Sequence, residues 1–156
     1  MYRRILVAFD GSPTSTRALE EALGLAGLMK SRLRLVHAVD EMKHVTGFET
    51  FTAYTHDVLP RLRAGGERVL KHGLEQAARA GVDADSRLVM SSGDRVCDVV
   101  AKQARSWDAD LIVVGTHGRR GVDRVLLGSD AEQILRIAPA PVLLVRGAAD
   151  QEPVHA

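Results

Sequence analysis

The chain has 156 residues and a formal net charge of +1, and 46% of its residues are hydrophobic and 26% charged. This is the balance of an ordinary soluble globular protein of one domain. The net charge is small, and only three Phe, one Trp and two Tyr are present. We therefore expect no nucleic-acid binding, which needs a basic surface. Cys97 is the single cysteine, which excludes a disulfide within the chain and a multi-cysteine metal site.

The first residues hold two arginines and then only five apolar residues, at positions 5–9, before Asp10 and Gly11. This apolar run is too short for the core of a signal peptide, and no run in the sequence is long enough to cross a membrane. We therefore expect a cytoplasmic protein that makes no membrane contact.

Short apolar runs alternate with longer amphipathic stretches along the first half of the chain. Residues 5–9 predict a buried strand that ends in a turn. Over residues 15–30, apolar side chains recur at intervals of three and four, which predicts a helix. Residues 33–39 predict a second strand, and the mixed composition of residues 40–52 predicts a loop.

The second half of the chain repeats this alternation. A helix is predicted over residues 53–80, although Pro60, Gly65, Gly66 and Gly73 each weaken a helix interior. The remaining predicted elements are a weak strand over 87–90, a helix with its apolar face between Val96 and Trp107, strands over 111–114 and 142–145, and a short helix over 129–138.

Five apolar strands that alternate with four helices predict one doubly wound α/β domain, with a parallel sheet covered on both faces. We place this domain at residues 1–147 and expect residues 148–156 to form a flexible tail. In such sheets, ligands bind beyond the carboxyl ends of the strands. The segments that follow the first, second and fourth strands are therefore the candidate site.

A glycine-rich segment, residues 115–128, follows the fourth strand and is about twice as long as the usual connection of about 2 to 6 residues. Gly115 and Gly118 leave room for main-chain N–H groups to approach an anion. Gly128 and Ser129 stand where the last helix begins, and the free N–H groups of a helix start attract anions. Two groups of donors that flank one crevice suit the phosphates of a nucleotide.

The same residues also have a purely structural interpretation. Gly115 could simply end a strand, and Gly128 could admit a tight turn. Ser129 and Glu132 have the spacing of a capping box, which needs no ligand. The residues alone leave phosphate binding and a structural role equally open.

The pattern Gly115-x2-Gly118-x9-Gly128-Ser129 resembles the ATP-binding signature of the universal stress protein family. The first strand with its Asp-Gly-Ser turn and the segment 139–145 resemble that family too, so the resemblance covers residues 2–146. It implies an adenine nucleotide α-hydrolase-like fold with strand order 3-2-1-4-5. It also implies that an adenine nucleotide, ATP or else ADP or AMP, with or without Mg²⁺, lies over the strand ends.

The resemblance further assigns roles by position. It implies that Ala8 and Val39 line an adenine pocket and that Asp10 contacts the ribose or a phosphate-bound metal ion. Asp10 before Gly-Ser-Pro is equally good turn chemistry, and Ala8 and Val39 suit a plain core. The residues implied to contact phosphates and ribose are Gly115, Thr116, Gly118, Gly128 and Ser129.

Asp130 departs from the family pattern, which commonly has a small or apolar residue just after the Gly-Ser pair. An acidic side chain in a first helical turn interacts favourably with the helix dipole. It repels phosphates if it points into the crevice, and a bridging Mg²⁺ ion would reverse that effect. Asp130 is therefore a candidate binding residue whose charge leaves open whether a nucleotide is held.

No catalytic constellation is evident in the sequence. There is no P-loop motif and no Gly-x-Ser-x-Gly motif, and Ser129 has no evident base partner. The histidines do not occur in pairs at metal-ligand spacing. We expect no enzyme activity beyond slow, incidental ATP hydrolysis.

The resemblance implies a nucleotide-binding regulator or sensor in stress responses. It also implies a homodimer that pairs through the last strand, residues 142–145, because an apolar edge strand invites pairing with a second copy. The alternative is a dimeric interaction module that has the same fold and binds no nucleotide.

Overall fold

The computed structural model describes residues 1–45, 47–48, 50–116 and 127–147, so the predicted tail lies outside the described residues. Five strands form one parallel sheet in the order β3-β2-β1-β4-β5, which confirms the expected architecture and strand order. The strands are β1 (Arg4–Ala8), β2 (Arg32–Asp40), β3 (Ala84–Ser91), β4 (Leu111–Gly115) and β5 (Val142–Val145). The helical elements are α1 (Pro13–Met29), η1 (Glu41–His44), α2 (Phe51–Ala53), η2 (Tyr54–Val58), α3 (Leu59–Arg79), α4 (Val96–Ser106) and α5 (Ser129–Ile137).

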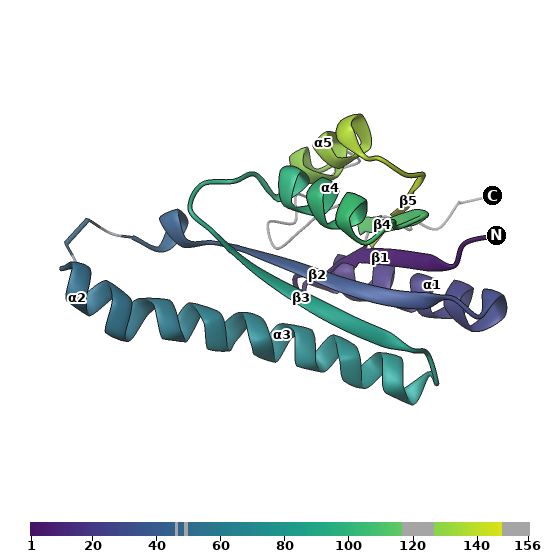
Figure 1. Cartoon of the computed structure of the whole chain (residues 1–156), viewed down its shortest axis with the longest axis horizontal. Helices are drawn as coiled ribbons and strands as arrows, with labels where there is room; N and C mark the ends of the chain where they lie inside the picture. Colours follow the sequence, from purple (N-terminus) through teal and green to yellow (C-terminus); the bar gives the residue numbers. More distant parts are fainter. Residues whose placement is uncertain (46, 49, 117–126, 148–156) are drawn as a thin grey trace, which may run out of the picture.

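Helices cover both faces of the sheet, α1 and α3 on one side and α4 and α5 on the other (Figure 1). Alternate residues of a strand point to opposite faces, and β1 shows this directly. Ile5 and Val7 pack into the core under α1 and α3, whereas Leu6 packs into the core under α4 and α5. Because both faces are covered, the central strands are apolar at almost every position.

The connection between β2 and β3 is more helical than expected. Part of the predicted loop over residues 40–52 forms the 3₁₀ turn η1 and the start of a helix at Phe51. From that residue, α2, η2 and α3 form one uninterrupted helical run to Arg79, which extends past the end of the sheet in Figure 1. Pro60 lacks an N–H group, and just before it the N–H of Leu59 donates to the carbonyl of Tyr54 in a π-helical turn. The helix therefore accommodates the proline by widening.

Two glycines that seemed to weaken this helix let α3 pack closely on the sheet. A β-carbon built on Gly66 would stand 2.5 Å from Cδ1 of Leu88, and one built on Gly73 would stand 2.7 Å from Cδ1 of Leu35. With any larger residue, either these leucine side chains or α3 itself would have to shift. The lower helix propensity of these glycines is offset by closer packing of α3 on the sheet.

The sheet has a step at its carboxyl edge. β1 pairs with β2 only as far as Ala8 opposite Val36, after which the N–H of Phe9 donates to the carbonyl of Val36. β2 and β3 continue together to Asp40 opposite Ser91. β2 and β3 therefore extend beyond the end of β1, and we call the edge where β1 ends beside them the ledge. The segment that follows β1 begins at this ledge.

Candidate functional site

Thr116 joins three elements at the carboxyl edge of the sheet. It directly follows β4, and its N–H donates to the carbonyl of Val145 at the end of β5 over 2.9 Å. Its own carbonyl accepts the N–H of Gly128, just before α5, over 2.7 Å. The structure thus brings Thr116, Gly128 and Ser129 together, as the predicted site requires. The amides of Thr116 and Gly128 are satisfied within the protein and are not among the donors left for a ligand.

The hydroxyl of Thr116 is buried and has no hydrogen-bond partner, the one such side-chain group in the part of the chain that the structure describes. An unsatisfied buried hydroxyl costs about 1–3 kcal/mol. A ligand oxygen within reach would remove that cost. This orphaned hydroxyl is therefore the feature of the edge that best fits a bound polar ligand.

The start of α5 has no side-chain cap. Its N-cap residue is Gly128, which has no side chain to accept from the N–H groups of the first turn. The capping box of Ser129 and Glu132, the structural alternative to phosphate binding, is not formed: the Glu132 carboxylate pairs with Arg136 at 2.8 Å, and the Glu132 N–H donates to the carbonyl of Gly128. A glycine N-cap displaces Ser129 into the first turn, where its hydroxyl cannot cap. Uncapped N–H groups at a helix start attract anions.

Asp10 follows the end of β1 and organises the turn into α1. One of its carboxylate oxygens accepts the N–H of Ser12 over 2.9 Å, and its own N–H donates to the hydroxyl of Ser15. The Ser12 side chain in turn caps α1 by accepting the N–H of Ser15. The turn interpretation of Asp10 is thereby confirmed, and its contact with a ribose or a metal ion stays a prediction.

Gly115 ends β4 against the first turn of α1. A β-carbon on Gly115 would stand 2.6 Å from Cγ2 of Thr14 and 3.0 Å from its carbonyl carbon and oxygen. Thr14 also lies against Gly147, which follows β5. Close packing therefore accounts for a glycine at 115 without a ligand. Sequence reasoning missed Thr14, which positions the ends of β4 and β5.

The side chains of Ala8 and Val39 face opposite sides of the sheet. Ala8 is half-buried and packs against the core under α4 and α5. Val39 is buried, and its Cγ2 lies against Gly66 of α3 on the other side. Ala38, which packs on the same core as Ala8, is the β2 side chain on that face. Val39 can therefore reach an adenine beside Ala8 only through its main chain.

Gly118 lies outside the described residues, as do the arginines and the histidine of the same segment. Asp130, by contrast, is described and lies exposed in the first turn of α5. Of the nine candidate binding residues, the structure therefore places all but Gly118.

A hollow of about 470 Å³ lies beside the start of α1, lined by Gly11, Pro13, Thr16, Arg17 and Glu20. It includes none of the predicted binding residues, and the Arg17 guanidinium already lies 3.8 Å from the Glu20 carboxylate. Among the described residues, no group of three or more His, Cys, Asp or Glu side chains could hold a metal ion. No helix in that part of the chain is long and apolar enough to cross a membrane.

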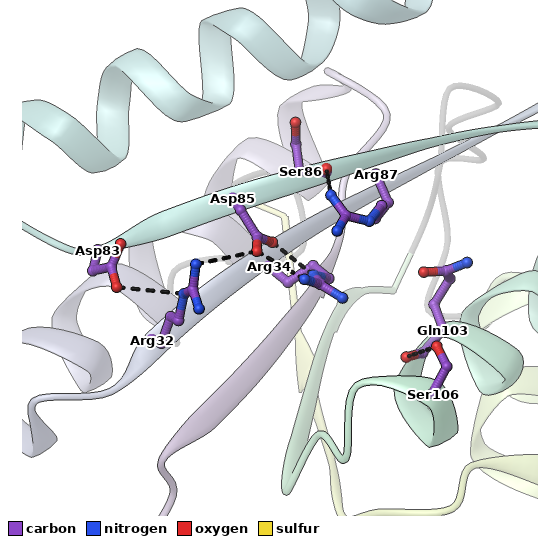
Figure 2. Close-up of polar contacts among 8 residues, drawn as sticks. All are labelled: Arg32, Arg34, Asp83, Asp85, Ser86, Arg87, Gln103 and Ser106. Carbon is purple, nitrogen blue, oxygen red and sulfur yellow. Dashed lines mark hydrogen bonds and ion pairs between the residues drawn. The ribbon is translucent and has the colours of Figure 1, made fainter.

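Away from the candidate site, a cluster of polar side chains lies on the face of β2 and β3 near α4 (Figure 2). Arg34 forms a two-pronged pair with Asp85, with N–O distances of 2.6 and 2.8 Å. The Arg34 guanidinium also stacks on Trp107, 4.6 Å from the ring centre. Arg32 bridges Asp83 and Asp85 across the two strands. The hydrogen bond from Arg34, and then the charges nearby, hold the pKa of the Asp85 carboxyl below its ordinary value.

This cluster explains why the strand predicted from the sequence is shorter than β3 is in the structure. Its residues from Ala84 to Ser86 are largely polar, so the sequence predicted a strand only from residue 87. In the structure the Asp85 carboxylate pairs with Arg32 and Arg34 on β2 instead of packing into a core. Their groups bond one another, which indicates a stabilising role rather than a ligand site.

Comparison with known proteins agrees with this fold. A sequence model of the universal stress protein family matches residues 1–146. This chain belongs to the universal stress protein family. A putative universal stress protein of Staphylococcus epidermidis is 34% identical over 146 residues, which are 93% of this chain and 84% of that protein. A universal stress family protein of Burkholderia pseudomallei, solved as a crystal structure, is 37% identical with a TM-score of 0.72, over 92% of this chain and 95% of that chain.

Two further solved universal stress proteins were crystallised with adenine nucleotides. One, in complex with cAMP, is 25% identical with a TM-score of 0.66 and covers 94% of this chain and 98% of its own. The other, from Arabidopsis thaliana with AMP bound, is 21% identical with a TM-score of 0.69 and covers 98% of this chain and 97% of its own. Some members of the family therefore bind adenine nucleotides.

Proposed function

We propose that residues 1–147 form a nucleotide-binding domain that holds an adenine nucleotide, ATP, ADP or AMP, over the carboxyl ends of β1 and β4. The observation that carries this proposal is the buried Thr116 hydroxyl, which has no partner among the residues that the structure describes. It lies on a residue hydrogen-bonded to Gly128 at the uncapped start of α5. A hydroxyl and free helix N–H groups on one side of a crevice are suitable donors for ribose and phosphate oxygens.

The other predicted residues have complementary roles in this proposal. The adenine lies beside the Ala8 side chain and the main chain of Val39, on the ledge where β1 ends and β2 continues. Asp10 is close enough in sequence to the end of β1 to meet the ribose or a Mg²⁺ ion that arrives with the phosphates. Gly118 contributes main-chain N–H groups to the phosphates. We propose that the nucleotide regulates or reports a stress response in the cytoplasm and that turnover is not the function.

The test is a pair of substitutions at Thr116, after mass spectrometry of nucleotides released from the purified protein. Thr116→Val keeps the shape and removes the hydroxyl, so we expect nucleotide affinity to fall about tenfold in calorimetric titration. The free energy of unfolding of the ligand-free protein should stay equal or rise by about 1 kcal/mol, because an unsatisfied buried group is removed. Thr116→Ser keeps the hydroxyl and should keep the affinity. Unchanged affinity in Thr116→Val would exclude this hydroxyl from the site.

We also propose that two copies pair through β5. The main chain of β4 bonds to the carbonyls of Pro141 and Val145, and alternate residues of a strand point to opposite sides. The main-chain groups of Val142 and Leu144 therefore point away from β4, along the edge of the sheet. We expect Leu144→Asp to yield monomers in sedimentation, with thermal unfolding to check the fold. Leu28→Asp, at an exposed position on α1, is the control. A dimer mass in Leu144→Asp would rule out this interface.

A dimeric interaction module without nucleotide is the second candidate function. The exposed Asp130 carboxylate at the start of α5 favours it, because a negative charge there opposes phosphate binding. This candidate predicts that no nucleotide copurifies and that titration with ATP or AMP gives no heat of binding.

A further inference from the structure

β3 is the outer strand at one side of the sheet, next to β2. The N–H of Leu33 in β2 donates to the carbonyl of Asp83, so the main-chain groups of the odd-numbered residues of β3 point toward β2. Those of the even-numbered residues point away from the sheet: Ala84, Ser86, Leu88 and Met90. Among the described residues, none of these outward groups bonds to the main chain of another element. A strand laid beside β3 would therefore meet a row of main-chain donors and acceptors.

The side chains along β3 alternate between the two faces of the sheet. Val89 packs against the core under α4, so Asp85 and Arg87 lie on that same face. Asp85 pairs there with arginines of β2. Arg87 is exposed, and it pairs with no carboxylate in the part of the chain that the structure describes; its guanidinium donates instead to the carbonyl of Ser86 over 2.9 Å (Figure 2). The outer edge of β3 thus carries a cation without an ionic partner, two residues from a carboxylate.

We propose that β3 pairs with β3 of a second copy of this chain, antiparallel and about a two-fold axis at Ser86. In this register, Asp85 of each copy stands opposite Arg87 of the other. The outward main-chain groups of Ser86 form a hydrogen-bonded pair on the axis, which makes the Asp85–Arg87 positions non-hydrogen-bonded pairs, where opposed side chains are closest. Opposite charges that face each other in this way stabilise a strand pair. The surface is therefore complementary to itself, as a two-fold interface requires.

Neighbouring registers lack this complementarity. An axis at Asp85 or at Arg87 places two like charges directly opposite each other, which destabilises the pair. An axis at Leu88 places Arg87 opposite Val89 and leaves the guanidinium without a carboxylate. The axis at Ser86 is therefore the register that the charges of β3 favour.

The hydrogen bond from Arg87 to its own Ser86 carbonyl allows an opposite interpretation. Charged side chains on an outer strand often prevent pairing, and Arg87 could block the edge in this way. The two interpretations predict opposite effects when the Arg87 side chain is removed: pairing weakens if Arg87 reaches Asp85 of the second copy, and it strengthens if Arg87 blocks the edge. The inference concerns a surface apart from the nucleotide site and from β5, so its failure leaves the proposed function standing.

Cysteine cross-linking of the full chain tests the register. Ser86→Cys places two thiols at the axis, where the Cα atoms of a hydrogen-bonded pair are about 5.5 Å apart, a distance that a disulfide spans. Met90→Cys is the matched control, because Met90 is on the same strand and face and is also partly exposed. In this register its two copies are about 27 Å apart. With diamide as oxidant, we expect at least about fivefold more cross-linked dimer from Ser86→Cys than from Met90→Cys. Equal yields from the two variants, or no dimer from Ser86→Cys, would overturn the inference.

Removing the Arg87 side chain tests the charge pairing. Sedimentation over a range of protein concentrations is carried out on the Leu144→Asp background, so that pairing through β5 does not contribute. Arg87→Ala removes both cross-strand ion pairs of the dimer, and we expect the Kd of the dimer to rise about fivefold or more. Arg17→Ala removes the same charge from α1, at a side chain that is 43% exposed, and should leave the Kd unchanged. Thermal unfolding verifies that each variant is folded. A lower Kd in Arg87→Ala, or equal effects of the two substitutions, would contradict the proposed pairing.

Discussion

Thr14 packs so closely on Gly115 that a β-carbon at 115 would stand 2.6 Å from the Thr14 methyl carbon. The first turn of α1 is thereby seated against the end of β4, directly before Thr116. The same threonine lies against Gly147 after β5. A contact within the fold, rather than a contact to a ligand, thus fixes the position of the edge on which the proposed site is built.

Gly115→Ala tests this contact. The Thr14 carbonyl carbon and oxygen would both lie 3.0 Å from the new methyl group, and main-chain atoms cannot move aside as a flexible side chain can. We expect the free energy of unfolding to fall by about 1–3 kcal/mol, measured by urea unfolding. Gly27→Ala is the control: it lies in α1 with no atom within 4 Å of the new methyl group. It should raise stability by about 0.5–1 kcal/mol. Equal effects of the two substitutions would mean that Thr14 does not constrain Gly115.

Neighbouring glycines in α3 allow a sharper comparison. Gly66 faces Leu88, whose Cδ1 would lie 2.5 Å from a new β-carbon, whereas at Gly65 the nearest atom is the mobile end of Arg68 at 3.8 Å. We expect Gly65→Ala to raise the melting temperature, because alanine favours a helix. Gly66→Ala should lower it, at a cost of about 1–3 kcal/mol.

The cause of the Gly66→Ala effect can be checked in the same series. Leu88→Ala removes the atoms that the new methyl group meets. In the double variant, Gly66→Ala should therefore cost less than it does alone, by a coupling of about 0.5 kcal/mol or more. Strict additivity of the two substitutions would show that α3 does not meet β3 at this point.

These contacts mark the limit of what the sequence could predict. The strands around Ile5, Val113 and Leu144 are apolar runs bounded by turn residues, so their existence followed from the hydrophobic pattern. Gly66 counts against a helix when only local propensity is considered, and its value appears only once α3 lies on β3. Local chemistry can be read along the chain, whereas close approach between distant elements cannot.

The candidate site could likewise be predicted from the sequence only in part. The glycine spacing predicted that Thr116, Gly128 and Ser129 lie at one edge of the sheet, because parallel strands place their carboxyl ends together. The opposite orientations of Ala8 and Val39 depend on which residues of β1 and β2 are paired, and pairing register is not visible in a single sequence. The capping box failed because Gly128 competes with Ser129 for the N-cap position. The spacing of Ser129 and Glu132 alone could not decide between them.

The Arg34–Asp85 pair gives a prediction on pH. The pKa of Asp85 lies below its ordinary value of 3.8 in the folded protein, chiefly because Arg34 donates hydrogen bonds to the carboxylate. A carboxyl group with a lowered folded pKa contributes stability at pH values above its unfolded pKa. That contribution is lost as the pH falls through the folded pKa. Wild type should therefore lose stability as the pH falls below about 4, in part through Asp85.

Asp85→Asn isolates this contribution. At pH 7 we expect it to lower the free energy of unfolding by about 1–2 kcal/mol, because Arg34, whose side chain is only 11% exposed, loses its charged partner. The difference from wild type should shrink at an acid pH well below 3.8, as Asp85 itself becomes protonated. Asp98→Asn is the matched control: it breaks an Arg–Asp pair with an N–O distance of 2.8 Å whose side chains are 63% and 47% exposed. Loss of such an exposed pair should lower stability much less than loss of the Arg34–Asp85 pair. The free energy of unfolding of all three proteins is measured by urea unfolding at both pH values. If the difference between wild type and Asp85→Asn does not depend on pH, the charge of Asp85 does not stabilise the fold.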